Sequence, residues 1–450
     1  MKIVGFLALL GAGLSGCSDD LDHLVEVPDN TCSVPAKCDI EQDACVRAVL
    51  AITACERGDE TPPLPEIRHV SQAMFAEELA QMSSEEAPDS WDAALRSMHL
   101  LAADAGSNEA SLQETAEQVV AYFDPKTKSV SLIDETSGDQ LTNMYTLSHE
   151  LAHYLQDRAH DLLELQDSFG GSTDAQTAAR ALIEGDAVVS STRVLARLEG
   201  HSPRAIDWQG YFEQLDDTLA SAIAEASFPL GSALLTLPYE VGARYIAGVW
   251  DSYGRERVDR LFQVQVAPRT IGDWFAGYGA GKPQPSLEQP LDCMPPLDVE
   301  GFELLGADSF GATGVAAMLG AAAAAGSGRA SDIWLASTIG LRADIVAGYG
   351  PSGEGGGPTL LIWRLRFATD GAAHAFADRL PWDDVGRRIF GSELVLAAGP
   401  GVTRDTLPTA VETCPTLGGL AAALTTMRSR APTAWVHERA PVSIRPQFLD

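Results

Sequence analysis

A five-residue motif, His149-Glu150-Leu151-Ala152-His153, restricts the local fold of this chain more than any other segment. Residues four positions apart lie on the same face of an α-helix, so both imidazoles can bind a single metal ion. Glu150 is rotated by about 100° around that helix and can contact a water molecule bound to the metal. The alternative is a helix with one buried and one solvated histidine and no metal. The helix is indicated by Ser137-Gly138-Asp139-Gln140, which matches a capping box and predicts a helix through about Arg158.

A catalytic zinc site needs three protein ligands and an open position for water. Glu184 is the candidate third ligand, because it lies in a second predicted helix, at about residues 173–198, with small apolar residues one turn away on either side. A carboxylate on such an apolar stripe is costly to bury unless it is paired or bound to metal. The alternative role for Glu184 is a salt bridge to Arg180 or Arg193.

His160 is another candidate for the third ligand, because it follows His153 on what is predicted to be the same helix. The metzincin pattern requires a glycine and then a histidine at fixed positions after the second histidine of the motif. This chain has Gln156 and Ala159 at those positions. Glu184 is therefore preferred over His160.

The first residues resemble a bacterial export signal. Met1 and Lys2 give a positive start, and residues 3–14 form an apolar stretch too short to span a bilayer stably. The stretch ends in Leu14-Ser15-Gly16-Cys17, which resembles a lipobox, where cleavage before the cysteine is followed by lipidation of its thiol. The alternative is an ordinary signal peptide with a cysteine near its cleavage site. Lipid on Cys17 would anchor the protein in the bacterial cell envelope, on the periplasmic or outer-surface side, without a membrane span.

The remaining cysteines predict disulfide bonds. If Cys17 carries lipid, six cysteines are left, and an even number in an exported protein favours pairing. We expect the four early ones to staple a small module and the two late ones to be free to close a longer loop, with the connectivity left open. The six candidates are Cys32, Cys38, Cys45, Cys55, Cys293 and Cys414.

The charge balance excludes some partners. The 450 residues include 63 acidic and 31 basic side chains, which gives a net charge of −32. Such a charge argues against binding to nucleic acid and against direct binding to anionic lipid headgroups. Apart from the signal, the most apolar run is residues 315–326, which is too short to cross a membrane and predicts a packed helix.

The pattern of elements predicts an α+β protein of several parts. We expect a signal peptide at residues 1–17, a cysteine-rich tether at 18–64, a mainly helical zinc domain with a small sheet at 65–280, and a C-terminal α+β domain at 295–450. Strands are expected at residues 118–123, 129–133, 333–337, 360–367 and 394–396. Further helices are expected near residues 68–79, 91–103, 238–254, 371–380 and 417–427.

The metal-site candidates resemble those of the gluzincins, the metallopeptidase group that includes thermolysin-like enzymes. The resemblance is based on a histidine–glutamate–histidine motif followed by a glutamate on a later helix. The chain is more similar still to an uncharacterised set of exported bacterial metalloprotease-like lipoproteins, over roughly residues 65–280. The segments that carry this likeness are Ala121 to Pro125, Ser148 to Asp157, Ala181 to Ala187 and Pro238 to Gly242.

The chain departs from these families at two places. Thermolysin-like enzymes have an aspartate four residues after the glutamate ligand that supports a histidine, and here Val188 occupies that position. Asp186 or Asp157 is the expected replacement. The segment Pro268-Arg269-Thr270-Ile271-Gly272 also lacks a glutamate that the relatives carry, which bears on local details of the cleft and not on the metal.

The resemblance implies a peptidase with one Zn²⁺ per chain and a peptide or protein as substrate. Glu150 would act as general base, and Tyr239 is the candidate donor to the oxyanion, with a purely structural aromatic as its alternative. A strand such as residues 129–133 is expected to border the cleft and pair with an extended peptide. Two rival functions are a non-catalytic, zinc-binding surface lipoprotein and a zinc hydrolase with a non-peptide substrate.

Overall fold

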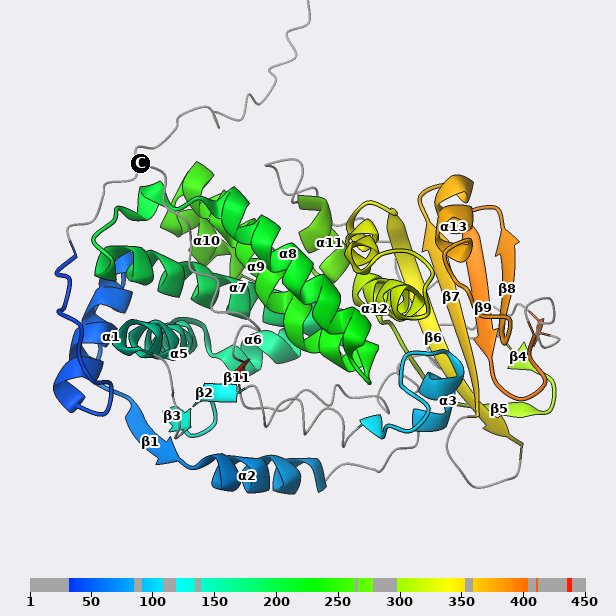
Figure 1. The fold of residues 1–450 in the computed structure, drawn as a ribbon, viewed down its shortest axis with the longest axis horizontal. Coiled ribbons are helices and arrows are strands. Elements are labelled where there is room, and N and C mark those ends of the chain that lie inside the picture. Colours follow the sequence, from blue (N-terminus) through cyan, green and yellow to red (C-terminus); the bar gives the residue numbers. More distant parts are fainter. Residues whose placement is uncertain are drawn as a thin grey trace, which may run out of the picture.

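The computed structural model describes residues 32–84, 91–107, 119–133, 139–263, 266–277, 298–352, 359–403, 410–411 and 435–438. Within these residues the chain is an α+β protein, as predicted. A bundle of helices lies between a small sheet and a larger one (Figure 1). The metal-site candidates lie in the helical part, on the side of the small sheet.

The helical part contains the long helices expected around the motif. The helices of the described chain are α1 (Asp43–Arg57), α2 (Gln72–Ser84), α3 (Asp92–Ser97), α5 (Gln140–His160), α6 (Leu162–Phe169), α7 (Thr173–Leu198), α8 (Trp208–Glu225), α9 (Pro229–Tyr253), α10 (Arg255–Leu261), α11 (Ile271–Gly277), α12 (Gly311–Ala324) and α13 (Asp370–Ala377), with 3-10 helices at η1 (Pro203–Ala205) and η3 (Ala330–Ser337). The predicted helix at about residues 173–198 matches α7 in type and extent.

The strands form two larger sheets and one short pair. The small sheet has the order β1-β3-β2-β11, from β1 (Glu66–Val70), β3 (Ser129–Ile133), β2 (Val119–Asp124) and β11 (Trp435–Glu438). The β1–β3 pair is parallel and the other pairs of this sheet are antiparallel. The larger sheet is antiparallel with the order β5-β6-β7-β9-β8, from β5 (Phe302–Asp308), β6 (Leu341–Pro351), β7 (Leu360–Phe367), β9 (Glu393–Ala398) and β8 (Val385–Phe390). The short pair joins β4 (Asp298–Val299) to β10 (Ala410–Val411).

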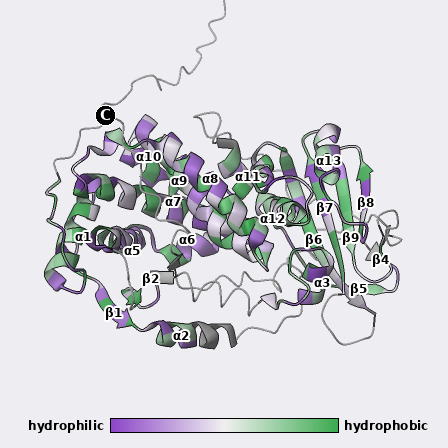
Figure 2. Cartoon of the chain, in the orientation of Figure 1, coloured by the Kyte–Doolittle hydropathy of each residue, from purple (hydrophilic) through white to green (hydrophobic). Residues whose placement is uncertain are grey.

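The main hydrophobic core of the described residues extends from the helical part into the larger sheet. It runs from Ile40, next to α1, to Ala398 at the end of β9. Helix α12 links the two regions, because its small residues allow close packing: Gly314 lies against Trp363 of β7, and Gly320 lies against Ile223 of α8. Figure 2 shows α12 and the central strands as largely hydrophobic, as the predicted packed helix requires.

Two disulfides staple the N-terminal segment. Cys32 pairs with Cys55, and Cys38 pairs with Cys45. The prediction of a stapled element among the four early cysteines is confirmed. The segment is also attached to the helical part, because α1 carries core residues and Thr53 Oγ1 lies 2.9 Å from Ser148 Oγ on α5. Cys17, Cys293 and Cys414 lie outside the described residues.

Several predicted elements were wrong. Residues 333–337 form part of the 3-10 helix η3 and not a strand, and residues 66–70 form β1 where a helix was expected to begin. Helix α9 begins at Pro229, with Pro238 in its interior and not at its first turn. The prediction at 417–427 lies outside the described residues. No helix among the described residues is long and apolar enough to cross a membrane.

The helix α9 tolerates its internal proline because another residue compensates for the missing hydrogen bond. Pro238 has no N–H to donate to the carbonyl four residues earlier, which belongs to Leu234. Arg180 Nη1 of α7 donates to that carbonyl oxygen at 3.0 Å. The helix therefore continues to Tyr253, and the interaction fixes α9 against α7.

Candidate metal centre

Helix α5 positions both histidines and Glu150. Its N-cap is Asp139, whose side chain accepts hydrogen bonds from the backbone N–H groups of Leu141 and Thr142, so the cap lies two residues after the predicted Ser137. Asp161 ends the helix in a left-handed conformation, with φ of 47°, and caps α6 with its side chain. The helix is buried where it carries the motif, and His149, Glu150 and His153 are all at most 1% exposed.

Helix α7 brings Glu184 to the two histidines. It crosses α9 at a point where glycine is required on both helices. A Cβ on Gly185 would lie 2.2 Å from the backbone of Gly242, and a Cβ on Gly242 would lie 1.9 Å from the carbonyl oxygen of Ala181. The two glycines therefore allow the helix that carries Glu184 and the helix that carries Tyr239 to approach closely.

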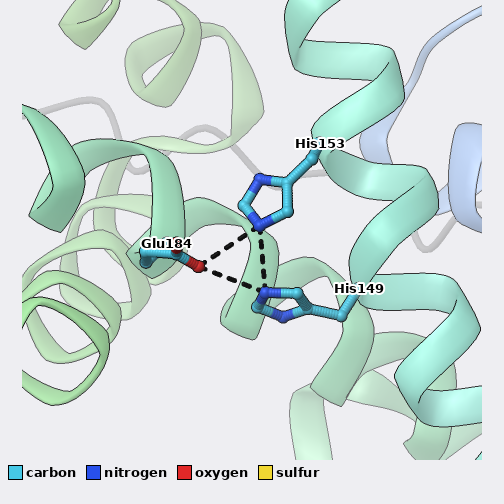
Figure 3. A group of neighbouring side chains, drawn as sticks. All are labelled: His149, His153 and Glu184. Carbon is cyan, nitrogen blue, oxygen red and sulfur yellow. Dashed lines mark hydrogen bonds and ion pairs between the residues drawn. The ribbon is translucent and has the colours of Figure 1, made fainter. Parts of the chain in front are cut away.

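The three predicted ligands converge on one point. His149 Nε2 lies 3.2 Å from Glu184 Oε2, His153 Nε2 lies 3.2 Å from the same oxygen, and the two Nε2 atoms are 3.0 Å apart (Figure 3). Glu184 Oε1 is buried and makes no hydrogen bond to the described residues. The buried group of His149, His153 and Glu184 could hold a metal ion.

The spacing of these three atoms is compatible with a single metal ion. Ligand atoms about 2.0–2.1 Å from a tetrahedral ion are about 3.3 Å apart, close to the separations of 3.0–3.2 Å found here. The salt-bridge alternative for Glu184 does not apply, because both arginines are engaged elsewhere. Arg180 donates to Leu234, and Arg193 lies 3.4 Å from Glu56 and stacks over Trp250.

The electrostatics of the site set the ionisation of the three candidate ligands. Burial lowers the pKa of His149 to about 4, so this imidazole is neutral at neutral pH. Burial would lower the pKa of His153 too, but the neighbouring Glu184 carboxylate raises it. Burial would raise the pKa of Glu184, yet His153 and His149 hold it well below its usual value. A neutral imidazole and an ionised carboxylate are the forms that bind a cation, so His149 and Glu184 are already in these forms, whereas His153 must give up its proton when a metal binds.

Glu150 is placed beside the ligand group and not in it. Both of its carboxylate oxygens are buried, and neither makes a hydrogen bond of normal geometry to the described residues. Burial raises the pKa of Glu150 to about 8, an effect that His153 and the nearby backbone of Phe123 partly offset. A buried carboxyl group without a structural partner is costly, and such groups are concentrated at functional sites.

His153 is oriented by a chain of buried polar groups that sequence reasoning missed. Its Nδ1 lies 2.8 Å from Gln156 Oε1, and the Gln156 amide donates to Asp186 Oδ2 at 2.9 Å and to the Ile183 carbonyl. Arg57 of α1 donates to the same Asp186 oxygen at 2.6 Å, and Arg255 pairs with the other oxygen. Burial would raise the pKa of Asp186, but these two arginines hold it well below its usual value.

The expected support from an aspartate is therefore indirect. Asp186 acts through Gln156, and Asp157 instead pairs with Lys128 at 2.6 Å. The Gln156 position was noticeable in the sequence only as a departure from the metzincin pattern. Its role could have been suspected because it follows His153 by nearly one helical turn, on the same face.

The other candidates have mixed outcomes. The Tyr239 ring is half-buried, with its centroid 6.1 Å from that of His149, so α9 brings this phenol beside the site. His160 is not part of the ligand group and stacks on Phe262 at 4.4 Å. Residues 268–272, which lack the glutamate of the relatives, lie at α6, where Arg269 donates to the carbonyls of Ser168 and Phe169.

Strand β3 has no free backbone edge for a peptide, contrary to expectation. It is an inner strand, between β1 and β2, so both of its backbone edges are already paired. Strand β2 lies on the side of β3 away from β1, and its outer edge pairs with β11. The prediction that residues 129–133 pair with a peptide is therefore wrong.

Comparison of the chain with protein-family models, with curated proteins and with solved structures gives no match. The function must therefore be inferred from the geometry of the site.

Proposed function

We propose that this protein is a zinc-dependent peptidase of the gluzincin type. The observation that carries the proposal is the placement of Glu150, a buried carboxyl group without a structural hydrogen bond, directly beside three converging ligand atoms. Two imidazoles and one carboxylate are a ligand set typical of catalytic zinc with an open fourth position. Such an ion, when bound, lowers the pKa of a water molecule and polarises a carbonyl group.

The residues around the ligands have roles that follow from their positions. Glu150 accepts a proton from the attacking water and passes it to the leaving amine of the peptide. Tyr239 donates a hydrogen bond to the negative charge that develops on the substrate's carbonyl oxygen. Gln156 and Asp186 hold the imidazole of His153 in one orientation, because a fixed hydrogen bond at one ring nitrogen determines the role of the other.

The export signal adds a location to this activity. We propose that lipid on Cys17 anchors the protein in the bacterial cell envelope, while the acidic body remains in solution. Replacement of Cys17 by serine should move the protein from the membrane fraction to a soluble or unprocessed form, because the acyl chains supply the membrane affinity. A variant that stays firmly membrane-bound would contradict the anchor.

The proposal is tested with Glu150→Gln. The substitution keeps the shape of the side chain and removes the base, so zinc should remain near one ion per chain while hydrolysis of casein or a peptide library falls on the order of a hundred- to ten-thousandfold. Asp157→Asn is the matched control, because Asp157 is a buried carboxylate on the same helix that pairs with Lys128 and does not contact the ligands. The control should keep both zinc and activity.

The outcomes separate this function from its rivals. A wild-type protein that binds zinc but cleaves no peptide would overturn the peptidase proposal and leave a zinc-binding lipoprotein or a hydrolase with another substrate. Equal activity of the wild type and Glu150→Gln would show that Glu150 is not the base. Chelator-resistant hydrolysis would exclude a metal mechanism.

A further inference from the structure

The outer edge of β2 carries a segment from the far end of the chain. Strand β11 pairs antiparallel with β2, with Trp435 opposite Phe123 and Val436 opposite Tyr122, and the register shifts after His437 (Figure 1). An outer strand offers a row of N–H and C=O groups to any extended peptide that can reach it. Here four residues near the end of the chain, far from β2 in sequence, take that position.

This edge lies beside the metal site. The backbone of Phe123 is close enough to Glu150 to influence its carboxyl group, and the Phe123 ring lies 6.2 Å from the ring of Tyr154 on the same helix, α5. Trp435 is the residue of β11 that lies opposite Phe123. A peptide paired with β2 in this register therefore passes next to the strand residue that neighbours Glu150.

The metal site is closed in this arrangement. His149, Glu150, His153 and Glu184 are each at most 1% exposed, so a polypeptide cannot reach them unless some segment moves away. Strand β2, next to Glu150, pairs with β3 on its inner side and with β11 on its outer side, so β11 is the outer strand on this side of the sheet in the described part of the chain. Its four-residue length makes it easier to displace than the strands inside the sheet.

The composition of the chain end fits a segment that docks on the protein's own surface. Residues 413–450 contain four arginines and only two acidic residues, whereas the whole chain has 63 acidic and 31 basic residues. Opposite charge favours contact between this end and the acidic body. In the sequence, Pro432 precedes and Pro441 follows residues 435–438, and proline cannot donate to a strand ladder.

We propose that the outer edge of β2 is a docking site for an extended peptide, and that residues 435–438 occupy it as a tethered occupant that competes with such a peptide. The docking itself follows from strand pairing, whereas its effect on hydrolysis rests on the proposed peptidase function. A peptide substrate must displace β11 before it can pair with β2.

The test weakens the pairing of β11 while leaving the rest of the chain intact. In an antiparallel pair, the N–H groups of neighbouring residues point alternately toward and away from the partner strand. Val436→Pro and His437→Pro each remove one of these N–H groups, so at least one of the two variants loses a hydrogen bond between the strands. Val436→Ala is the matched control, because it shortens the side chain and keeps the backbone donor. Hydrogen exchange of residues 119–124 should be at least about tenfold faster in one or both proline variants and unchanged in the control.

Binding of a synthetic peptide of residues 432–441 gives a second measurement that does not depend on exchange rates. The labelled peptide should bind the more affected proline variant at least about tenfold more tightly than the wild type, because the tethered segment competes for the site. It should also restore slow exchange to β2. If the peptidase proposal holds, the same variant should cleave peptides with a lower apparent KM and an unchanged kcat.

Two results would overturn the docking proposal. One is equal exchange of residues 119–124 in the wild type and in both proline variants, and the other is equal peptide binding by all of these proteins. Faster exchange together with tighter peptide binding, but no hydrolysis by any variant, would support docking and count against the peptidase function. The two proposals can therefore fail separately.

Discussion

The metal site and the junction between α7 and the larger sheet both bury several acidic side chains, but they use them in different ways. At the metal site the carboxylates of Glu150 and Glu184 have oxygens that make no hydrogen bond to the described residues. Burial lowers the pKa of the neighbouring His149, whereas the Glu184 carboxylate raises the pKa of His153. The carboxylates of Glu150 and Glu184 therefore leave hydrogen-bonding capacity unused.

At the junction, the carboxylates are engaged by the start of two helices. Asp308 accepts from the backbone N–H of Thr173, at the beginning of α7, and from that of Ser309, shortly before α12. Asp344 of β6 has both oxygens bonded, to four donors at the start of α12 and on β7: Ser309 Oγ, the N–H groups of Phe310 and Gly311, and Trp363 Nε1. These carboxylates join the helical part to the sheet.

The comparison shows that burial alone does not distinguish a functional acid from a structural one. What differs is whether the oxygens are bonded to backbone groups of the protein. A carboxylate at a helix N-terminus satisfies N–H groups that would otherwise lack partners. A carboxylate that faces two imidazoles and keeps one oxygen unbonded still has the capacity to bind a cation.

The largest effect is expected from Glu184→Gln. Loss of the anionic ligand should weaken zinc binding by more than about a hundredfold, because three ligands are the minimum for a catalytic site. Glu56→Gln is the control: Glu56 is equally buried but pairs with Arg193 and Arg197. Its loss should lower the free energy of unfolding and leave zinc binding unchanged. Full zinc content in Glu184→Gln would refute Glu184 as a ligand.

Asp344→Ala should have the opposite effects to Glu184→Gln: it should destabilise the fold and leave zinc binding unchanged. Removal of its carboxylate leaves buried donors without an acceptor, which should lower the free energy of unfolding by roughly 3 kcal/mol. Zinc measured per folded chain should stay the same, because Asp344 is not part of the ligand group. Chemical denaturation and metal analysis check the two expectations. A stable variant that has lost zinc would reverse the roles assigned to the two regions.

The sequence identified the three residues of the candidate metal site because their placement depends on local periodicity. His149 and His153 are four residues apart, and Glu184 lies within a helix whose apolar face was readable in isolation. The support for His153 was missed because it needs tertiary contacts. Gln156 reaches Asp186 on α7, and Asp186 in turn depends on Arg57 of α1 and on Arg255. No local pattern brings these four residues together.

The errors in the predicted elements have similar causes. Residues 333–337 are an apolar run too short to identify as strand or helix by periodicity. Pro238 was assigned to a helix start because proline usually lies there, but Arg180 compensates for it inside α9. Strand order is not encoded locally, so β3 was taken for an edge strand although β1 and β2 pair with it on both sides.

Gln156→Leu should have an intermediate effect that is specific to the metal site. It removes the acceptor for His153 Nδ1 while keeping a side chain of similar size, and loss of such support typically weakens metal affinity about 10- to 100-fold. Competition with a chelator measures the affinity, and the absorption spectrum of the Co²⁺ form should shift because the geometry around His153 changes. Gln156→Glu keeps an acceptor and should restore part of the affinity. A purely structural glutamine would leave the Co²⁺ spectrum unchanged.

The smallest effect is a pH dependence at the junction. Burial raises the pKa of Asp308 to about 7 in the folded protein, from a usual value of 3.8, with Asp344 as a nearby like charge. Between these values the folded state holds a proton that the unfolded state has lost, so this group lowers the free energy of unfolding as pH rises from about 4 to 7.

Asp308→Asn tests this effect, because the amide resembles the protonated acid and does not titrate. The free energy of unfolding of the variant minus that of the wild type should increase as pH rises from 4 to 7, by at most about 1.4 kcal/mol per pH unit, and become constant above that range. The subtraction removes the contribution of groups that titrate equally in both proteins, including those at the metal site. Urea denaturation at several pH values, in the presence of a chelator, measures the difference. A constant or decreasing difference across this range would show that Asp308 is ionised in the folded protein well below pH 7, and that its hydrogen bonds from Thr173 and Ser309 outweigh the cost of burial.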